Sequence, residues 1–109
     1  MKKMLVLTVV ALAATALVAR AEDAKVIYEK QCAKCHGAEG KGDTKMGKKI
    51  KAADFTDPKV QEKFTDEQMS KAIKEGVKDD QGKIKMPPAK SVTDDDIKAL
   101  VRLVREFKK

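Results

Sequence analysis

The amino-acid sequence predicts an all-α fold built as one small domain. In its clearest segments apolar residues recur at three- and four-residue steps, and helix-capping residues stand where those segments begin. No segment of any length shows the alternation typical of a strand. Because 38% of the 109 residues are charged, the apolar residues form only a thin core for an independent fold.

Residues 1–21 have the composition of a secretory signal peptide. Two lysines precede an uncharged apolar run of 15 residues (4–18), and Ala19-Arg20-Ala21 provides a small-x-small cleavage site. The run is shorter than the roughly 20 residues that a membrane-spanning helix needs. We therefore expect cleavage after Ala21, export to the periplasm and a mature domain spanning residues 22–109. An uncleaved N-terminal anchor is the alternative.

Cleavage would change the charge of the chain. The signal segment holds three of the 24 basic residues and none of the 17 acidic ones, so the formal net charge falls from +7 to +4. The sequence has no Trp and few other aromatic residues, which are the stacking surfaces of single-strand binders. We expect no nucleic-acid partner.

The mature chain opens with a predicted helix from Asp23 to about Ala33, whose apolar face is formed by Ala24, Ile27, Tyr28 and Cys32. Gly37 suits the end of a helix. Residues 38–56 hold three glycines and five lysines without any period, so we expect an irregular loop there. Its lysines either serve docking or are simply solvated.

Two short helices are predicted next. Asp57 before Pro58 has the pattern of an N-cap followed by proline at the first helical position. Thr65 and Gln68 fit a capping box that begins a second helix, and Gly76 would end it.

Residues 77–92 are predicted to be loop, and the last helix follows them. Thr93 caps this helix and three aspartates fill its first turn, where their negative charge interacts favourably with the positive end of the helix dipole. Its face is continuously apolar, through Ile97, Leu100, Val101, Val104 and Phe107.

The segment Cys32-Ala33-Lys34-Cys35-His36 holds both cysteines and the one histidine of the sequence. The pattern C-x-x-C-H is typical of covalent attachment of a c-type haem. Two thiols three positions apart lie on one side of a helical turn, so Cys32 and Cys35 can each form a thioether with the same porphyrin. His36 then lies within reach of the iron as the proximal ligand.

Three other readings of the motif remain open. A thiol–disulfide redox pair is typically accompanied by a βαβ pattern, and none occurs here. A closed zinc site needs four ligands, whereas this chain offers three within five residues. A structural disulfide over so short a loop would constrain little of the unfolded chain.

A haem iron with one histidine needs a sixth ligand, and the count excludes a second histidine. The mature chain offers three methionines: Met46, Met69 and Met86. Met69 lies on an apolar helix face, where methionine usually fills core space. Met46 follows His36 too closely to cross to the other face with ease. Met86 lies 50 residues beyond His36 and precedes two prolines that hold the chain extended, so it is the preferred ligand.

With Cys32-Ala33-Lys34-Cys35-His36-Gly37, Met86-Pro87-Pro88 and a capped C-terminal helix in this order, the chain resembles class I c-type cytochromes, above all the small soluble monohaem bacterial ones. The resemblance implies the cytochrome c fold: three to four short helices and long loops around one covalent haem c, with the first and last helices crossing. It also implies thioethers at Cys32 and Cys35 and axial bonds from His36 and Met86.

The sequence departs from the family pattern at three positions. Ala24 replaces the glycine common eight residues before the first cysteine, and Leu103 replaces a late aromatic, with Phe107 one turn further on. Ala53 replaces the proline whose carbonyl commonly orients the proximal imidazole. A backbone carbonyl at Ala53 would still accept the imidazole proton.

The resemblance implies a one-electron carrier rather than an enzyme, shuttling between a redox protein donor and acceptor that are membrane-bound or periplasmic. Lysines near the exposed haem edge would steer it to acidic docking surfaces; the candidates are Lys45, Lys48, Lys49 and Lys85. We expect a monomer that does not span the membrane. The alternatives are a haem enzyme or gas sensor from which Met86 dissociates, and a haem-free thiol protein.

Overall fold

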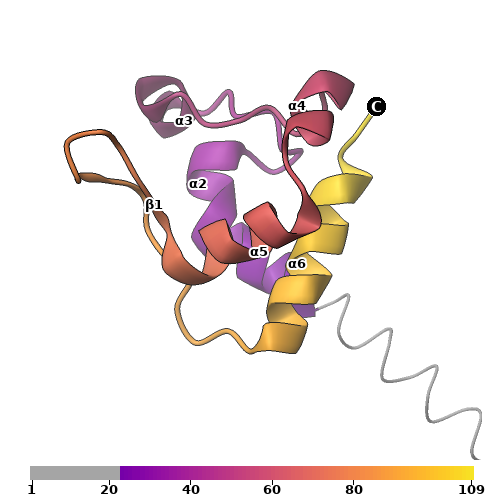
Figure 1. Cartoon of the computed structure of the whole chain (residues 1–109). Helices are drawn as coiled ribbons and strands as arrows, with labels where there is room; N and C mark the ends of the chain where they lie inside the picture. Colours follow the sequence, from indigo (N-terminus) through magenta and orange to yellow (C-terminus); the bar gives the residue numbers. More distant parts are fainter. Residues whose placement is uncertain (1–22) are drawn as a thin grey trace, which may run out of the picture.

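The computed structural model describes residues 23–109, so the predicted signal peptide lies outside the described part. Residues 23–27 begin a helix that continues through a π-helical turn, η1 (Tyr28–Cys32), into α2 (Ala33–His36). The chain then forms α3 (Lys45–Ile50), α4 (Pro58–Lys63), α5 (Asp66–Glu75), the strands β1 (Val77–Lys78) and β2 (Ile84–Met86), and α6 (Asp94–Glu106) (Figure 1). The fold is mostly helical, as the sequence predicts.

The predicted helix starts are confirmed by their caps. The Asp57 carboxylate accepts from a backbone N–H in the first turn of α4, directly before Pro58. Complete capping boxes begin α5, through Thr65, and α6, through Thr93. Each box satisfies two backbone donors that would otherwise lack a partner at a helix N-terminus.

The loop predicted for residues 38–56 is wrong in part, because α3 lies within it. Six residues are too few to show a helical period, and Gly47 lowers the helix propensity further. Tertiary contacts determine that this segment forms a helix. The Thr44 hydroxyl accepts from the Gly47 N–H, which caps α3, and it also donates to carbonyl oxygens at the end of α2.

Residues 77–92 were predicted to be loop, and the structure adds a short antiparallel hairpin there to the mostly helical fold. Val77 pairs with Met86 across it. The Asp79 carboxylate accepts two backbone N–H groups of the turn, and Gly82 has φ 80°. The hairpin is therefore closed by local turn chemistry, and its strands are too short to show the alternation by which a strand is predicted.

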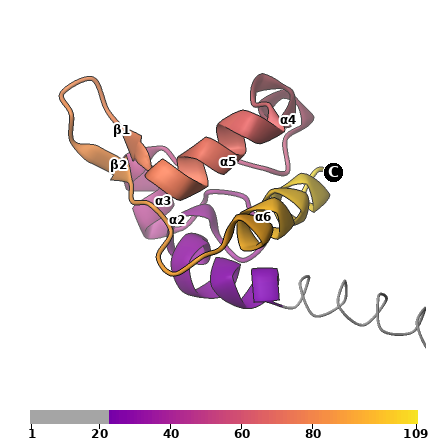
Figure 2. The same cartoon turned by 60° about the horizontal axis from the view of Figure 1, so that its bottom comes forward.

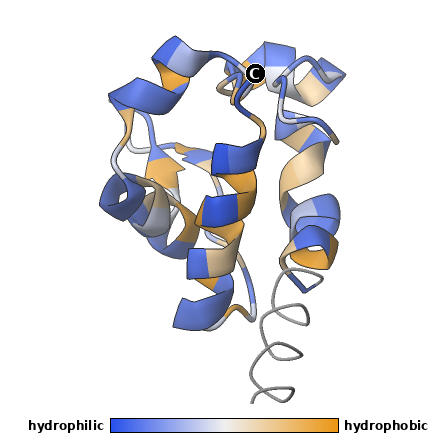
Figure 3. Cartoon of the chain, turned by 90° about the vertical axis from the view of Figure 1, so that its right-hand side faces the viewer, coloured by the Kyte–Doolittle hydropathy of each residue, from blue (hydrophilic) through white to orange (hydrophobic). Residues whose placement is uncertain are grey.

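The core lies where the first and last helices meet. In Figure 2, α6 lies between the N-terminal helix and α5, and the helices carry hydrophobic and hydrophilic residues on different faces (Figure 3). The rings of Tyr28 and Phe107 are 5.2 Å apart. One cluster contains the buried apolar side chains Ala24, Tyr28, Met69, Ile73, Ile97, Leu100, Val101 and Val104. Ala24 is thus accommodated at the position where the family often has glycine.

No helix within residues 23–109 combines the length and the apolar character that crossing a bilayer requires.

Gln61 is the buried polar residue that joins α4 to α6. Its side-chain amide donates to the Phe55 carbonyl at 2.7 Å and to the Val104 carbonyl at 2.9 Å, and its Oε1 accepts from Arg105 at 3.0 Å. Arg105 also bonds Asp66 at 2.9 Å. A buried amide is stable only when its bonds are made, so this residue fixes how the middle of the chain lies on α6.

Gln61→Leu keeps the approximate volume of the side chain but removes both donors. The partly buried Phe55 carbonyl loses this donor and the buried Val104 carbonyl keeps only the Phe107 N–H. An unsatisfied buried group costs about 1–3 kcal/mol. We expect the free energy of unfolding of the haem-loaded protein, measured with urea, to fall by about 2–4 kcal/mol. Gln81→Leu, at an exposed position of the hairpin turn, is the matched control and should change it little. Equal stability of the two variants would contradict this role.

Candidate haem-binding site

Cys32 and Cys35 lie on the one continuous helix that opens the described chain. Cys32 is the last residue of η1 and Cys35 lies in α2. The Ala33 N–H bonds back to the Tyr28 carbonyl, the wider spacing of a π-turn. Such turns occur often at functional sites. Both thiols are free and half-buried, so they are accessible for a covalent bond from one side of this helix.

The electrostatics of Cys32 argue against a redox-active thiol pair. Burial, and secondarily the neighbouring Cys35, raises the pKa of Cys32 to about 11. Thiols that exchange disulfides typically have a lowered pKa. Within residues 23–109 no group of three or more Cys, His, Asp or Glu is placed to hold a metal ion.

The end of the cysteine helix is held by two hydroxyl groups. The Tyr28 hydroxyl, buried in the core, donates to the Gly37 carbonyl at 2.6 Å. The Thr44 hydroxyl lies 2.7 Å from the Lys34 carbonyl and 3.0 Å from the Cys35 carbonyl, so its proton is shared between them. The Lys34 and Cys35 carbonyls are among those that a helix C-terminus leaves without an intrahelical donor, whereas the Gly37 carbonyl also accepts from the Gly40 N–H at 3.2 Å. The C-x-x-C-H segment is thus held by both the core and α3.

His36 is positioned by the segment that contains Ala53 and Phe55. Its Nδ1 lies 3.4 Å from the Ala53 carbonyl oxygen, a long hydrogen bond. A proton on Nδ1 leaves the lone pair on Nε2, which is the atom that can bind a metal. The Phe55 ring stacks on the imidazole, with ring centroids 4.6 Å apart. Burial lowers the pKa of His36, which favours the neutral imidazole that binds metal ions.

The segment behind His36 is anchored in turn. The Phe55 N–H donates to the Gly40 carbonyl at 2.7 Å, and its own carbonyl accepts from Gln61. The Lys109 N–H donates to the Thr56 carbonyl at 3.1 Å. The imidazole is therefore oriented through a chain of contacts that reaches α4 and the C-terminus.

The three methionines lie in different environments. Met69 is buried in the core cluster, in agreement with a packing role, whereas Met46 is 39% exposed on α3. Met86 is half-buried at the end of β2 and packs on the same cluster as Cys32. Gly76, at φ 78°, lies so close to the Met86 carbonyl that a Cβ there would approach its oxygen to 2.6 Å. The backbone of the Met86 segment thus lies directly against the end of α5.

These residues fit a covalently bound haem. They provide two free thiols for thioethers, a neutral imidazole with its Nε2 lone pair available, and a thioether sulfur on the Met86 loop. Around the buried cluster lie partly buried apolar groups suited to a porphyrin, among them Ile27, Ala33, Phe55, Ala89 and Val92.

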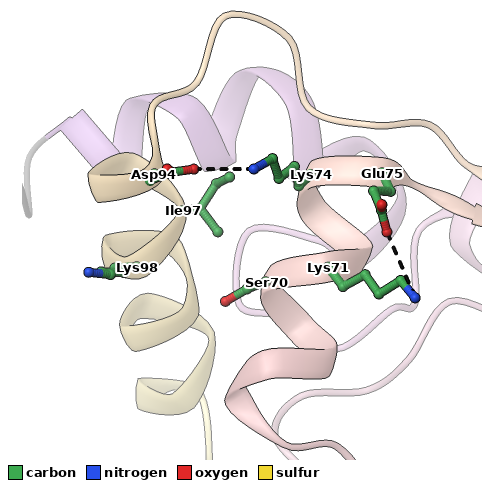
Figure 4. A pocket seen from close by; sticks show the side chains of 7 residues that line it. All are labelled: Ser70, Lys71, Lys74, Glu75, Asp94, Ile97 and Lys98. Carbon is green, nitrogen blue, oxygen red and sulfur yellow. Dashed lines mark ion pairs between the residues drawn. The ribbon is translucent and has the colours of Figure 1, made fainter.

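Two surface hollows lie outside this group of residues. One, of about 360 Å³, lies between α3 and the hairpin and is lined by Lys49, Ile50, Lys51, Asp79, Lys83, Ile84 and Lys85. The other, of about 460 Å³, lies between α5 and α6 (Figure 4). Lys74 pairs with Asp94 at 3.6 Å across this second hollow, which contains no cysteine, histidine or methionine. Of the two, only the first gathers lysines expected from the sequence, Lys49 and Lys85.

Comparison with known proteins agrees with this geometry. The sequence matches, over residues 19–104, a family model described as cytochrome c oxidase, cbb3-type, subunit III. A solved structure described as KustC0563 c-type cytochrome is 36% identical, with a TM-score of 0.67 and a match that covers 79% of this chain and 98% of that one. No curated protein sequence matches. The chain is a c-type cytochrome of this family.

Membership of this family implies that the protein transfers electrons through a haem and that this haem is covalently bound. Sequence reasoning missed several residues that support the site: Gln31, Thr44, Gly47, Phe55 and Gln61. Of these, Thr44 carried a signal, because a threonine that precedes a short charged run is a common helix N-cap. The others act through contacts between distant segments.

Gly47→Ala tests how closely α3 lies on the cysteine helix. At an ordinary exposed helix position this change stabilises a protein by about 0.5–1 kcal/mol. Here the added methyl would collide with the Cys35 carbonyl oxygen. We therefore expect urea unfolding of the haem-loaded protein to show a loss of about 1–3 kcal/mol. Lys48→Ala, at the neighbouring exposed position, is the control; a stabilised Gly47→Ala variant would contradict the close approach.

Proposed function

We propose that this cytochrome is a diffusible one-electron carrier with a single haem c, attached through Cys32 and Cys35 and ligated by His36 and Met86. The observation that supports it most is the C-x-x-C-H segment, whose two free thiols share one helix with an imidazole held by the Ala53 carbonyl. We further propose export by residues 1–21 and action in the periplasm.

The proximal role falls to His36 because the surroundings select both its protonation state and its orientation. Burial favours the neutral ring, and the bond to Ala53 favours the proton on Nδ1. Stacking against Phe55 limits rotation of the ring. A ligand held in this way changes its position little when the charge at the metal changes, and this suits fast electron transfer.

Met86 is the best distal candidate among the three methionines. Met69 fills the core, and Met46 lies on the exposed surface of α3. Met86 is half-buried, and the two prolines after it restrict the backbone. A methionine sulfur opposite histidine raises the potential of a c-type haem.

When bound, the haem supplies the one-electron couple, and the chain's residues hold both axial ligands in place. With His36 and Met86 both bound to the iron, no position would remain open for a substrate, so a carrier is favoured over an enzyme or gas sensor. A distal catalytic histidine is excluded, because His36 is the one histidine of the sequence.

The first hollow, which lies between α3 and the hairpin and is called the groove below, suits electrostatic steering to acidic redox partners. Four of its lysines, Lys49, Lys51, Lys83 and Lys85, surround Ile50 and the 63% exposed Ile84. Within residues 23–109 none of these lysines forms an ion pair. Unpaired positive charge around an apolar patch attracts an anionic partner and then allows a small contact. Lys45 and Lys48 extend the same charge along α3.

Met86→Ala tests the distal ligand. We expect loss of the iron–thioether charge-transfer band of the oxidised protein and a lower reduction potential, because a methionine ligand favours the reduced state. Optical spectra and redox titration provide the measurement. Met46→Ala and Met69→Ala are the matched controls and should keep the band. If either control loses it while Met86→Ala does not, the ligand is assigned to that residue instead.

Charge reversal tests the steering groove. We expect Lys83→Glu with Lys85→Glu to slow oxidation of the reduced cytochrome by the anion ferricyanide about tenfold at low ionic strength, with less effect as salt is raised. The measurement is the second-order rate by stopped flow. Lys71→Glu with Lys98→Glu, at the hollow in Figure 4, introduces the same charge change as a control. Equal slowing in both double variants would contradict a specific role of the groove lysines in steering.

A further inference from the structure

The side chain of Gln31 makes two hydrogen bonds to a segment far away in the sequence. Its Nε2 donates to the Lys90 carbonyl at 3.0 Å, and its Oε1 accepts from the Lys90 N–H at 2.8 Å. The two residues are 59 positions apart. The amide thus exchanges two hydrogen bonds with the backbone N–H and C=O of one residue, as two residues of a hydrogen-bonded pair do across antiparallel strands.

Both ends of this contact adjoin the site. Gln31 directly precedes Cys32 on the helix that carries the thiols, and Lys90 lies four residues after Met86. Pro87 and Pro88 between them have no backbone N–H. The first two amide donors after Met86 therefore belong to Ala89 and Lys90, and both are directed to other elements.

These two donors hold the Met86 loop from two sides. The Ala89 N–H bonds the Ile73 carbonyl at 2.8 Å, which ties the loop to α5. The Lys90 N–H and C=O both bond the Gln31 side chain, which ties the loop to the cysteine helix. With its two prolines the segment has few internal ways to relax. Releasing the Gln31 contact should therefore loosen it towards the cysteine helix, while the Ala89 bond and the pairing of Val77 with Met86 still hold it beside α5.

We propose that Gln31 is a positioning residue that keeps the Met86 loop closed over the site, so that the distal methionine rarely leaves the iron. The inference rests on the proposed ligation by Met86. A glutamine suits this task because one side chain supplies both a donor and an acceptor, and it carries no charge that would alter the site. The bonds are exposed to water, so each contributes modestly and the loop remains able to open.

The test is the binding of imidazole to the oxidised, haem-loaded protein, followed by its optical spectrum. An added ligand binds only when Met86 has left, so its apparent affinity reports the population of the open loop. Losing two modest hydrogen bonds should make Gln31→Ala bind imidazole about tenfold more tightly. Gln31→Glu keeps the acceptor for the Lys90 N–H but loses the donor, and should show a smaller increase.

Gln81→Ala is the matched control, since it truncates an exposed glutamine whose side chain makes no hydrogen bond within residues 23–109. It should leave imidazole affinity unchanged. Urea unfolding of all variants separates loop opening from general instability: a less stable Gln31→Ala protein with wild-type imidazole affinity would overturn the proposal.

Met86→Ala in the same assay separates this inference from the ligand assignment. Tight imidazole binding by Met86→Ala with wild-type binding by Gln31→Ala would leave the ligand in place and overturn the role of Gln31. Wild-type binding by Met86→Ala would overturn both.

Discussion

The packing of the N-terminal helix against α6 is the contact on which the rest of the structure depends. Ala24 and Tyr28 lie in one cluster with Leu100 and Val104, and the Tyr28 ring touches Phe107. The Tyr28 hydroxyl then reaches the Gly37 carbonyl, so the core directly holds the end of the segment that carries both thiols and the imidazole. Burial of Tyr28 also raises its pKa, so the hydroxyl keeps the proton that it donates.

The small size of this core gives the cofactor a structural part. The buried apolar cluster has eight side chains, and few domains of this length are stable on so little apolar burial alone. Several apolar groups around the cysteines are only partly buried. A porphyrin against them would add the missing apolar contact, so haem attachment and stable folding are expected to be coupled.

The two axial positions are supported by different kinds of contact. On the His36 side, each short segment is held by the next: Thr44 joins α3 to the cysteine helix, and Phe55 is held by Gly40 and Gln61. On the Met86 side, the loop is held at Ala89 and Lys90 by bonds to other elements. The contacts behind the imidazole are thus mostly partly buried, whereas the bonds between the Met86 loop and Gln31 are exposed.

The C-x-x-C-H motif is read directly from the sequence. Local patterns were also enough to predict the capped starts of α4, α5 and α6, and Gly37 and Gly76 as helix ends, because each depends on neighbours within a few residues. The hairpin is also local, closed by the Asp79 turn, but its strands are too short to show alternation in the sequence. Two features needed the folded chain. Helix α3 exists through the contact of Thr44 and Gly47 with α2. The pairing of Gln31 with Lys90 joins residues 59 positions apart, and no local pattern reports which distant peptide a side-chain amide will meet.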